Sequence, residues 1–171
     1  MSEVSPVSFR EVQRFGQAWI WVLVLMVTAV AWYGGYQQLI LKKPFGNNPG
    51  PDSLMWVILG VVGIGFPLFF YYLRLVTEVR TDGLYYRFYP LHFRFHRLAF
   101  SDIAGCEAVT YRPIRDYGGW GIRFGPRGKA FNVRGNRGVE LVLNDQSRIL
   151  IGSQKPEQLA MALSASLPRR A

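Results

Sequence analysis

The chain has 171 residues, half of them hydrophobic, and a net charge of +9 from 20 basic and 11 acidic residues. The single cysteine, Cys106, excludes an internal disulfide. Sixteen of the basic residues lie at or after Arg74, so the positive charge is concentrated in the C-terminal part. Beside a membrane the nearest polyanion is the lipid headgroup layer, and we therefore do not expect nucleic acid as the partner.

The N-terminal segment, residues 1–17, is predicted to be cytoplasmic or to lie in the membrane interface. Ser8 and Glu11 have the spacing of a capping box, which predicts a helix that begins near Phe9. Phe9, Val12 and Phe15 recur at three-residue steps, as expected for a helix with one apolar side. A solvated helix is the alternative to an interfacial one.

Two long segments contain no charged residue and no histidine, residues 15–41 and residues 53–73. A helix needs about 20 apolar residues to cross the hydrocarbon layer of a bilayer. We therefore predict a transmembrane hairpin over residues 18–75, with spans at 18–38 and 54–73 and an external loop at 42–52. A buried helix pair in a soluble protein is the alternative, but two such helices need a larger core than the remaining residues supply.

The orientation of this hairpin follows from the flanking charges. Basic residues precede the first span and follow the second, while fewer lie in the connecting loop: Arg10 and Arg14, then Arg74, Arg80 and Arg87, against Lys42 and Lys43. The positive-inside rule then places both termini in the cytoplasm. We expect a multi-pass protein of the inner (plasma) membrane. The spans contain no ionisable residue, which argues against an ion or substrate pathway.

The second span contains candidate helix-packing residues, Gly60, Gly63 and Pro67. Glycine gives a thin helix surface that allows close approach, and proline kinks a helix. These residues pack against the first span or against a partner subunit in the membrane.

After Arg74 the pattern changes to short stretches with alternating apolar residues, which predicts half-buried strands. Seven or eight strands are expected, at residues 84–89, 93–96, 106–111, 120–124, 131–133, 139–143 and 149–151. Pro156 then begins a helix in which Leu159, Leu163 and Leu167 form one apolar stripe. Residues 76–171 are thus predicted to form a small antiparallel barrel or sandwich closed by a C-terminal helix.

This order of elements, with segments such as residues 100–103 (Phe-Ser-Asp-Ile) and 151–153 (Ile-Gly-Ser), resembles the bacterial pleckstrin-homology-like (PH-like) membrane proteins. The resemblance implies an α+β membrane protein, with an N-terminal two-helix transmembrane hairpin and a cytoplasmic PH-like β-barrel or sandwich of about seven strands. It also implies recognition of lipid headgroups or protein segments, and no reaction.

Residues 111–138 combine seven glycines with seven basic residues and one acid, Asp116. Glycine allows the backbone to approach an anion, and arginine fits phosphate oxygens. The candidate anion- or partner-binding residues are Arg112, Arg115, Arg123, Arg127, Lys129, Arg134 and Arg137. Three interpretations remain open: a solvated basic face with glycine-shaped hairpins, a phosphate site, or a protein-docking loop.

No catalytic or cofactor-binding motif is present in the sequence. It contains neither a Gly-x-Ser-x-Gly elbow nor a phosphate-binding Gly-x-x-x-x-Gly-Lys motif. His92, His96 and Cys106 are too few to predict a metal site. We expect no enzyme and no cofactor, but a membrane-anchored adaptor or scaffold that binds a protein partner or anionic lipid. The alternative is a small accessory subunit of a larger membrane complex.

Overall fold

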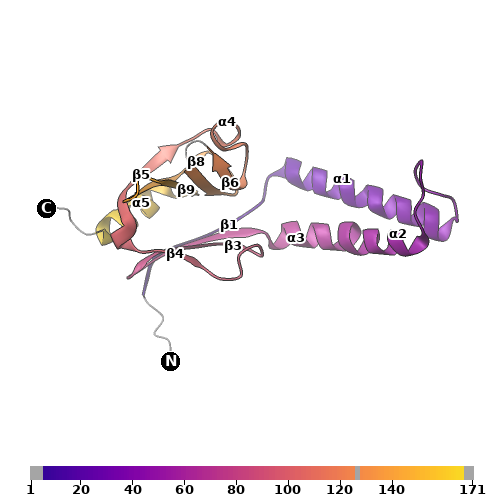
Figure 1. The fold of residues 1–171 in the computed structure, drawn as a ribbon, viewed down its shortest axis with the longest axis horizontal. Coiled ribbons are helices and arrows are strands. Elements are labelled where there is room, and N and C mark those ends of the chain that lie inside the picture. The colour runs from indigo at the N-terminus through magenta and orange to yellow at the C-terminus, as the bar shows by residue number, and fades with distance from the viewer. Residues whose placement is uncertain (1–5, 126–127, 168–171) are drawn as a thin grey trace, which may run out of the picture. The chain divides into compact units, whose positions relative to one another are not determined.

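The computed structural model describes residues 6–125 and 128–167 of the chain. It divides into two compact units (Figure 1). The helical unit comprises Phe15–Leu73, and the β-unit combines the residues before Phe15 with those from Arg74 onward. The chain therefore leaves the β-unit after its first strand and returns to it after the helices.

The helical unit is a pair of antiparallel helices (Figure 1). The first combines α1 (Ala18–Gly35) with a π-helical end (Tyr36–Ile40), and the second combines α2 (Asp52–Ile58), a π-helical stretch (Leu59–Gly65) and α3 (Phe66–Tyr72). Both helices, Ala18–Ile40 and Asp52–Tyr72, are long and apolar enough to cross a membrane. Their ends lie within two residues of the predicted spans.

Close contacts hold the two helices together. The indole Nε1 of Trp32 donates a hydrogen bond to the carbonyl oxygen of Gly63 at 3.1 Å. A Cβ atom on Gly63 would lie 3.1 Å from that same nitrogen, so Gly63 packs closely against α1. At the other end, the ring of Phe15 lies 6.3 Å from that of Phe70, edge to face.

The loop between the helices is connected by hydrogen bonds to the π-helical end of the first helix. The side-chain amide of Gln38 donates to the carbonyl of Gly50 at 2.8 Å and to the carboxylate of Asp52 at 3.1 Å. Lys42 forms an ion pair with Asp52 at 3.6 Å. The buried Gln38 is therefore a structural residue that connects the first helix to the start of the second.

The β-unit contains two open sheets. In the first, β1 (Val7–Arg14), β2 (Arg74–Arg80), β3 (Gly83–Tyr89) and β4 (His96–Leu98) pair antiparallel in that order. In the second, the order is β5 (Ile103–Thr110), β8 (Arg137–Leu143), β9 (Arg148–Gly152), β7 (Gly128–Asn132) and β6 (Gly121–Gly125). The predicted α+β class is confirmed. The sheets are open, however, and β7 pairs with β9 in parallel, so this part is not an all-antiparallel closed barrel.

Three short helices complete the β-unit. A 3₁₀ turn (Phe100–Asp102) precedes β5, α4 (Pro113–Tyr117) connects β5 to β6, and α5 (Pro156–Ser166) follows β9 (Figure 1). Leu159 and Leu163 of α5 are fully buried, as the predicted apolar stripe requires. They join a core to which the first sheet contributes Leu75 and Phe88, and the second Leu141, among others.

The prediction of a helix near Phe9 is wrong, because residues 7–14 form strand β1 and pair with β2. The less exposed side of β1 carries Phe9, Glu11 and Gln13, and two of these three residues are polar. This composition hides the alternation expected of a strand. The hydroxyl of Ser8, read as a helix cap, instead donates to the carbonyl of Val79 at 3.2 Å.

Tertiary partners explain why β1 forms despite the local helix signal. The carboxylate of Glu11 accepts hydrogen bonds from the Ser153 hydroxyl at 2.5 Å and from the Gln154 backbone N–H at 2.8 Å. The side-chain amide of Gln13 donates to the carbonyl of Gly152 at 2.6 Å. The inward polar residues of β1 thus bind the last residue of β9 and the segment that follows it, and these contacts connect β1 to the second sheet.

Candidate functional site

The β-unit contains an open cleft of about 620 Å³ between its two sheets. Residues of β3, β4, β6, β7 and the β8–β9 turn line it, with apolar walls and a polar mouth. The lining residues are Tyr86, His92, His96, Leu98, Ile122, Phe124, Gly128, Lys129, Phe131, Leu143, Asp145, Ser147, Arg148 and Ile149. The cleft is large enough for a small molecule or for a few residues of a partner protein.

One wall of the cleft is a stack of aromatic rings. His96 stacks on Tyr86 with ring centroids 5.5 Å apart, and Tyr86 contacts Phe131 at 4.6 Å. His92 lies edge to face against His96 at 4.3 Å. Burial, together with the charge of nearby His96, lowers the pKa of His92 below its usual value of 6.5. The neutral imidazole of His92 is therefore favoured at neutral pH.

Charged groups gather at the mouth of the cleft. Lys129 extends from β7 with its ammonium 5.9 Å from the ring of Phe124. Arg148 pairs with Glu140 on the neighbouring strand at 3.1 Å. The backbone N–H of Ser147 donates to the carboxylate of Asp145 at 2.9 Å, and hydrogen bonds from Ser147 lower the pKa of that carboxyl. Apolar walls below a cationic group favour a ligand that combines an acidic group with an apolar part.

The residues predicted to bind an anion do not converge on one site. Lys129 reaches the cleft, whereas Arg137 forms an ion pair with Glu157 at the start of α5. Arg134 is exposed in the connection between β7 and β8. Arg127 lies outside the described residues. Of the remaining three, Arg112 immediately precedes α4, Arg115 lies on α4 and Arg123 lies on β6.

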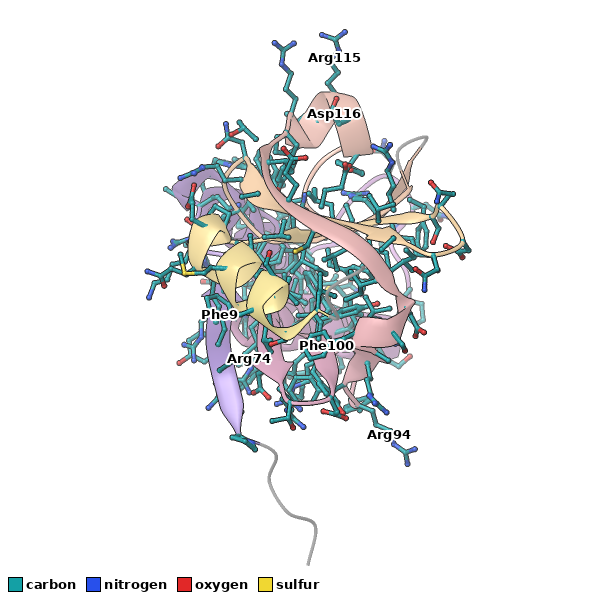
Figure 2. All side chains as sticks on the ribbon, turned by 90° about the vertical axis from the view of Figure 1, so that its left-hand side faces the viewer. Phe9, Arg74, Arg94, Phe100, Arg115 and Asp116 are labelled. Carbon is teal, nitrogen blue, oxygen red and sulfur yellow. The ribbon has the colours of Figure 1, made fainter. Side chains whose placement is uncertain are left out.

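These three arginines flank an edge with exposed apolar side chains. Arg115 on α4 points away from the β-unit (Figure 2), and the backbone N–H of Arg112 donates to the carboxylate of Asp116 at 2.8 Å. Gly118 ends α4 in the left-handed conformation, with φ of +72°. Ile114 on α4 and Phe124 on β6 are 71% and 72% exposed. This edge is basic and apolar at once, which suits a surface contact rather than an enclosed ligand.

The outer face of the first sheet carries arginine–aromatic stacks that the sequence analysis missed. The guanidinium of Arg80 lies 4.3 Å from the ring centroid of Tyr85, and that of Arg87 lies 4.5 Å from Phe95. Arg80 also pairs with the buried carboxylate of Glu78 at 2.6 Å. The signal was present in the sequence, because Tyr85, Arg87 and Tyr89 alternate on the polar side of the predicted strand.

The candidate helix-packing residues divide between two situations. Gly63 is buried against Trp32 of α1. Gly60 is exposed, and a Cβ atom there would meet no atom within 4 Å. Pro67 lies at the beginning of α3 and is half-buried. Only Gly63 therefore has a clear packing role within the helical unit.

Metal binding has no support among the described residues, which include no group of three or more His, Cys, Asp or Glu side chains placed to hold an ion. Cys106 lies on β5 with its sulfur 3.3 Å from the hydroxyl of Ser164 on α5. The two histidines belong instead to the cleft between the sheets. Cys106 is thus in a different environment from the two histidines, which contact each other.

The fold and composition define an α+β protein in which two apolar helices, each long enough to cross a membrane, interrupt a two-sheet β-unit. The chain belongs to a family of unknown function (DUF6141), whose model matches residues 2–168. No curated protein and no solved structure matches the chain significantly.

Proposed function

We propose that the protein is a non-enzymatic, membrane-anchored adaptor. In this proposal the helical unit spans the inner membrane as a hairpin with both termini in the cytoplasm. The β-unit is a PH-like module that binds a partner at the cytoplasmic face. Its cleft, with Lys129 at the mouth, is the proposed binding site for an acidic segment of a partner protein.

The observation that carries this proposal is the exposure of apolar side chains on both helices. Only 22% and 17% of the residues in the most apolar windows of the two helices are buried. Leu25, Trp56 and Val61 are 58%, 63% and 62% exposed. Soluble monomers rarely expose contiguous apolar patches above a few hundred Å², whereas a bilayer covers such a surface along the whole helix.

The aromatic residues at the ends of the helices support the same arrangement. Trp19, Tyr71 and Tyr72 lie at the helix ends that adjoin strands β1 and β2 along the chain, and each side chain is at least half exposed. Tyr36 and Trp56 lie near the opposite ends and are also exposed. Tyr and Trp prefer the two interfaces of a bilayer because their rings are amphipathic. At about 1.5 Å per residue, the helix from Trp19 to Tyr36 is about 26 Å long, slightly less than the roughly 30 Å thickness of the hydrocarbon layer.

The PH-like assignment is supported by two sheets, a C-terminal helix whose Leu159 and Leu163 are fully buried, and a cleft lined by residues of both sheets. The apolar lining favours a protein segment over a bare lipid headgroup, because a headgroup has no apolar part to fill the walls. Binding of an anionic lipid at this cleft is an alternative outcome of the test below.

Chemical cross-linking in native membranes, followed by purification of the full-length protein in mild detergent, tests the proposal. We expect a specific partner that is retained by the wild type and lost in Lys129→Glu. Lys155→Glu is the matched control, because Lys155 is exposed and precedes α5 rather than lining the cleft. An unchanged set of cross-linked proteins in Lys129→Glu contradicts the assignment of the cleft. If Lys129→Glu abolishes binding to anionic vesicles in a β-unit that lacks the helices, the ligand of the cleft is a lipid instead.

A small accessory subunit of a larger membrane complex is the second candidate. The open surface at Gly60 favours it, because exposed Val61 and Ile64 lie close by on the same helix and allow a neighbouring helix to approach. The same experiment distinguishes the two functions. An accessory subunit loses its partner in Gly60→Leu and keeps it in Lys129→Glu, whereas an adaptor shows the opposite.

A further inference from the structure

We propose that the turn between β3 and β4, residues 90–95, is a second membrane contact of the β-unit. Leu91 and Phe93 enter the headgroup region of an anionic leaflet, and Arg14, Arg74 and Arg94 bind its phosphates. This inference rests on the proposed insertion of the helical unit, and it names the lipid surface that the β-unit contacts.

Chain connectivity defines which end of the first sheet is near the membrane. Strand β1 ends at Arg14, the residue before the helical unit, and β2 begins at Arg74, the residue after it. Arg14 and Arg74 are register partners at one end of the antiparallel β1–β2 ladder. This end of the sheet is thus four residues before the first span and two residues after the second. If the spans are inserted, this end lies at the level of the lipid phosphates.

The third strand brings the turn to this same end of the sheet. Tyr89, the last residue of β3, is the register partner of Arg74, and the Arg74 guanidinium lies 5.0 Å from its ring centroid. The chain continues past Tyr89 before it reverses into β4. The turn is tight, because the backbone N–H of His92 donates to the carbonyl of Phe88 at 2.7 Å. The turn therefore lies at the sheet end marked by the two arginines.

The tip of the turn is apolar and exposed. Phe93 is 78% exposed, the highest value among the large hydrophobic side chains of the described residues, and Leu91 is 54% exposed. Among the described residues, the ring of Phe93 contacts only that of Tyr89, at a centroid distance of 6.4 Å. Side chains of this kind are unfavourable in water, and partitioning into the interface of a bilayer removes them from it.

The charge around this tip matches an anionic leaflet. Arg94 follows Phe93 directly and is exposed, and Arg14 and Arg74 lie at the adjoining strand ends. The sequence has no acidic residue at residues 12–16, 73–77 or 88–95, the segments that form this end of the sheet. Cations next to apolar side chains are the combination that peripheral membrane segments use on anionic lipid.

Fluorescence of the full-length protein in vesicles tests the proposal. In a Cys106→Ser background, the Phe93→Cys variant carries an environment-sensitive label and is reconstituted into vesicles of equal parts phosphatidylcholine and phosphatidylglycerol. Met161→Cys is the matched control, because Met161 is 72% exposed on α5 and far in sequence from the strand ends that join the helices. We expect a blue shift and quenching by brominated lipid for the label at Phe93 only. Leu91→Cys provides a second probe.

The outcomes separate this inference from the proposed function. If the protein floats with the vesicles but labels at Phe93 and Leu91 respond like the label at Met161, the inference is wrong while membrane anchoring stands. If the protein does not float with the vesicles, the proposed anchoring itself fails. Equal quenching in pure phosphatidylcholine supports insertion of the turn and overturns the role given to the arginines.

Discussion

Replacing the whole helical unit by a two-residue turn should yield a folded β-unit that is soluble in water. Arg14 and Arg74 are paired at the end of an antiparallel ladder, which is the geometry that a two-residue Asn-Gly turn closes. The variant joins Arg14 to Asn-Gly and then to Arg74. It loses Lys42, Lys43 and Asp52 with the helices, so its net charge falls only from +9 to +8. This remaining charge favours solubility.

The expected change in membrane partitioning follows from the residues removed. The two spans contain twenty Leu, Ile, Val and Phe residues. Each contributes roughly 0.3 to 0.6 kcal/mol to insertion near the bilayer centre, so together they contribute about 6 to 12 kcal/mol. This free energy corresponds to between about four and nine powers of ten in partitioning. The wild type should sediment with membranes on ultracentrifugation, and the Asn-Gly variant should remain in the supernatant.

The matched comparison is a chain that begins at Arg74 and therefore lacks β1. It loses the hydrogen bonds of Glu11 to Ser153 and Gln154 and that of Gln13 to Gly152. Each lost bond that leaves a buried group unpaired costs about 1 to 3 kcal/mol, against a total stability of about 5 to 15 kcal/mol for a small domain. Urea unfolding should show a much less stable protein. Equal stability of the two variants, or an Asn-Gly variant that still sediments with membranes, refutes this reasoning.

Three further predictions concern single residues of the β-unit in the Asn-Gly variant. Glu11→Ala should lower the free energy of unfolding by about 1.5 to 3 kcal/mol in urea, because it removes a charged acceptor; the exposed control Glu107→Ala should change it by less than about 0.5 kcal/mol. Burial lowers the pKa of His92 below 6.5, so the unfolded chain binds more protons in acid and the free energy of unfolding should fall as the pH drops below 6.5. An NMR titration that places the His92 pKa above 6.5 contradicts this reasoning. His96→Gln should raise the His92 pKa, because it removes a nearby positive charge. Burial raises the pKa of Tyr111 from 10.0 to about 12, so the free energy of unfolding should fall as the pH rises above 10. An absorbance titration should show one tyrosine that ionises only at a higher pH than the others, and this step should be missing in Tyr111→Phe.

The sequence predicts the elements whose signal is local and strong. The two helices were found because each is a long segment without charge, and strands β3, β8 and β9 because their apolar residues alternate. Strand β2 lacks this alternation, since residues on both of its sides are buried, and it follows directly on the second helix. Strand β1 was misassigned because Glu11 and Gln13 occupy its inward side.

The candidate site was less accessible to sequence analysis than the fold. The cleft is lined by residues between Tyr86 and Ile149 that meet only through the pairing of strands distant in sequence. The abundance of arginine in residues 111–138 correctly indicated a basic segment, but composition does not reveal partners. Arg137 pairs with Glu157, twenty residues later, whereas Lys129 reaches the cleft. Spatial placement therefore decides which cation can meet a ligand.

Alkaline carbonate extraction of isolated membranes tests the central claim most directly, because it releases peripheral proteins and leaves inserted helices in the bilayer. The full-length chain should remain entirely in the membrane pellet, since the side chains of Ala18–Ile40 and Asp52–Tyr72 would otherwise be exposed to water. Release of the full-length chain into the supernatant would contradict membrane insertion and, with it, the proposed adaptor function.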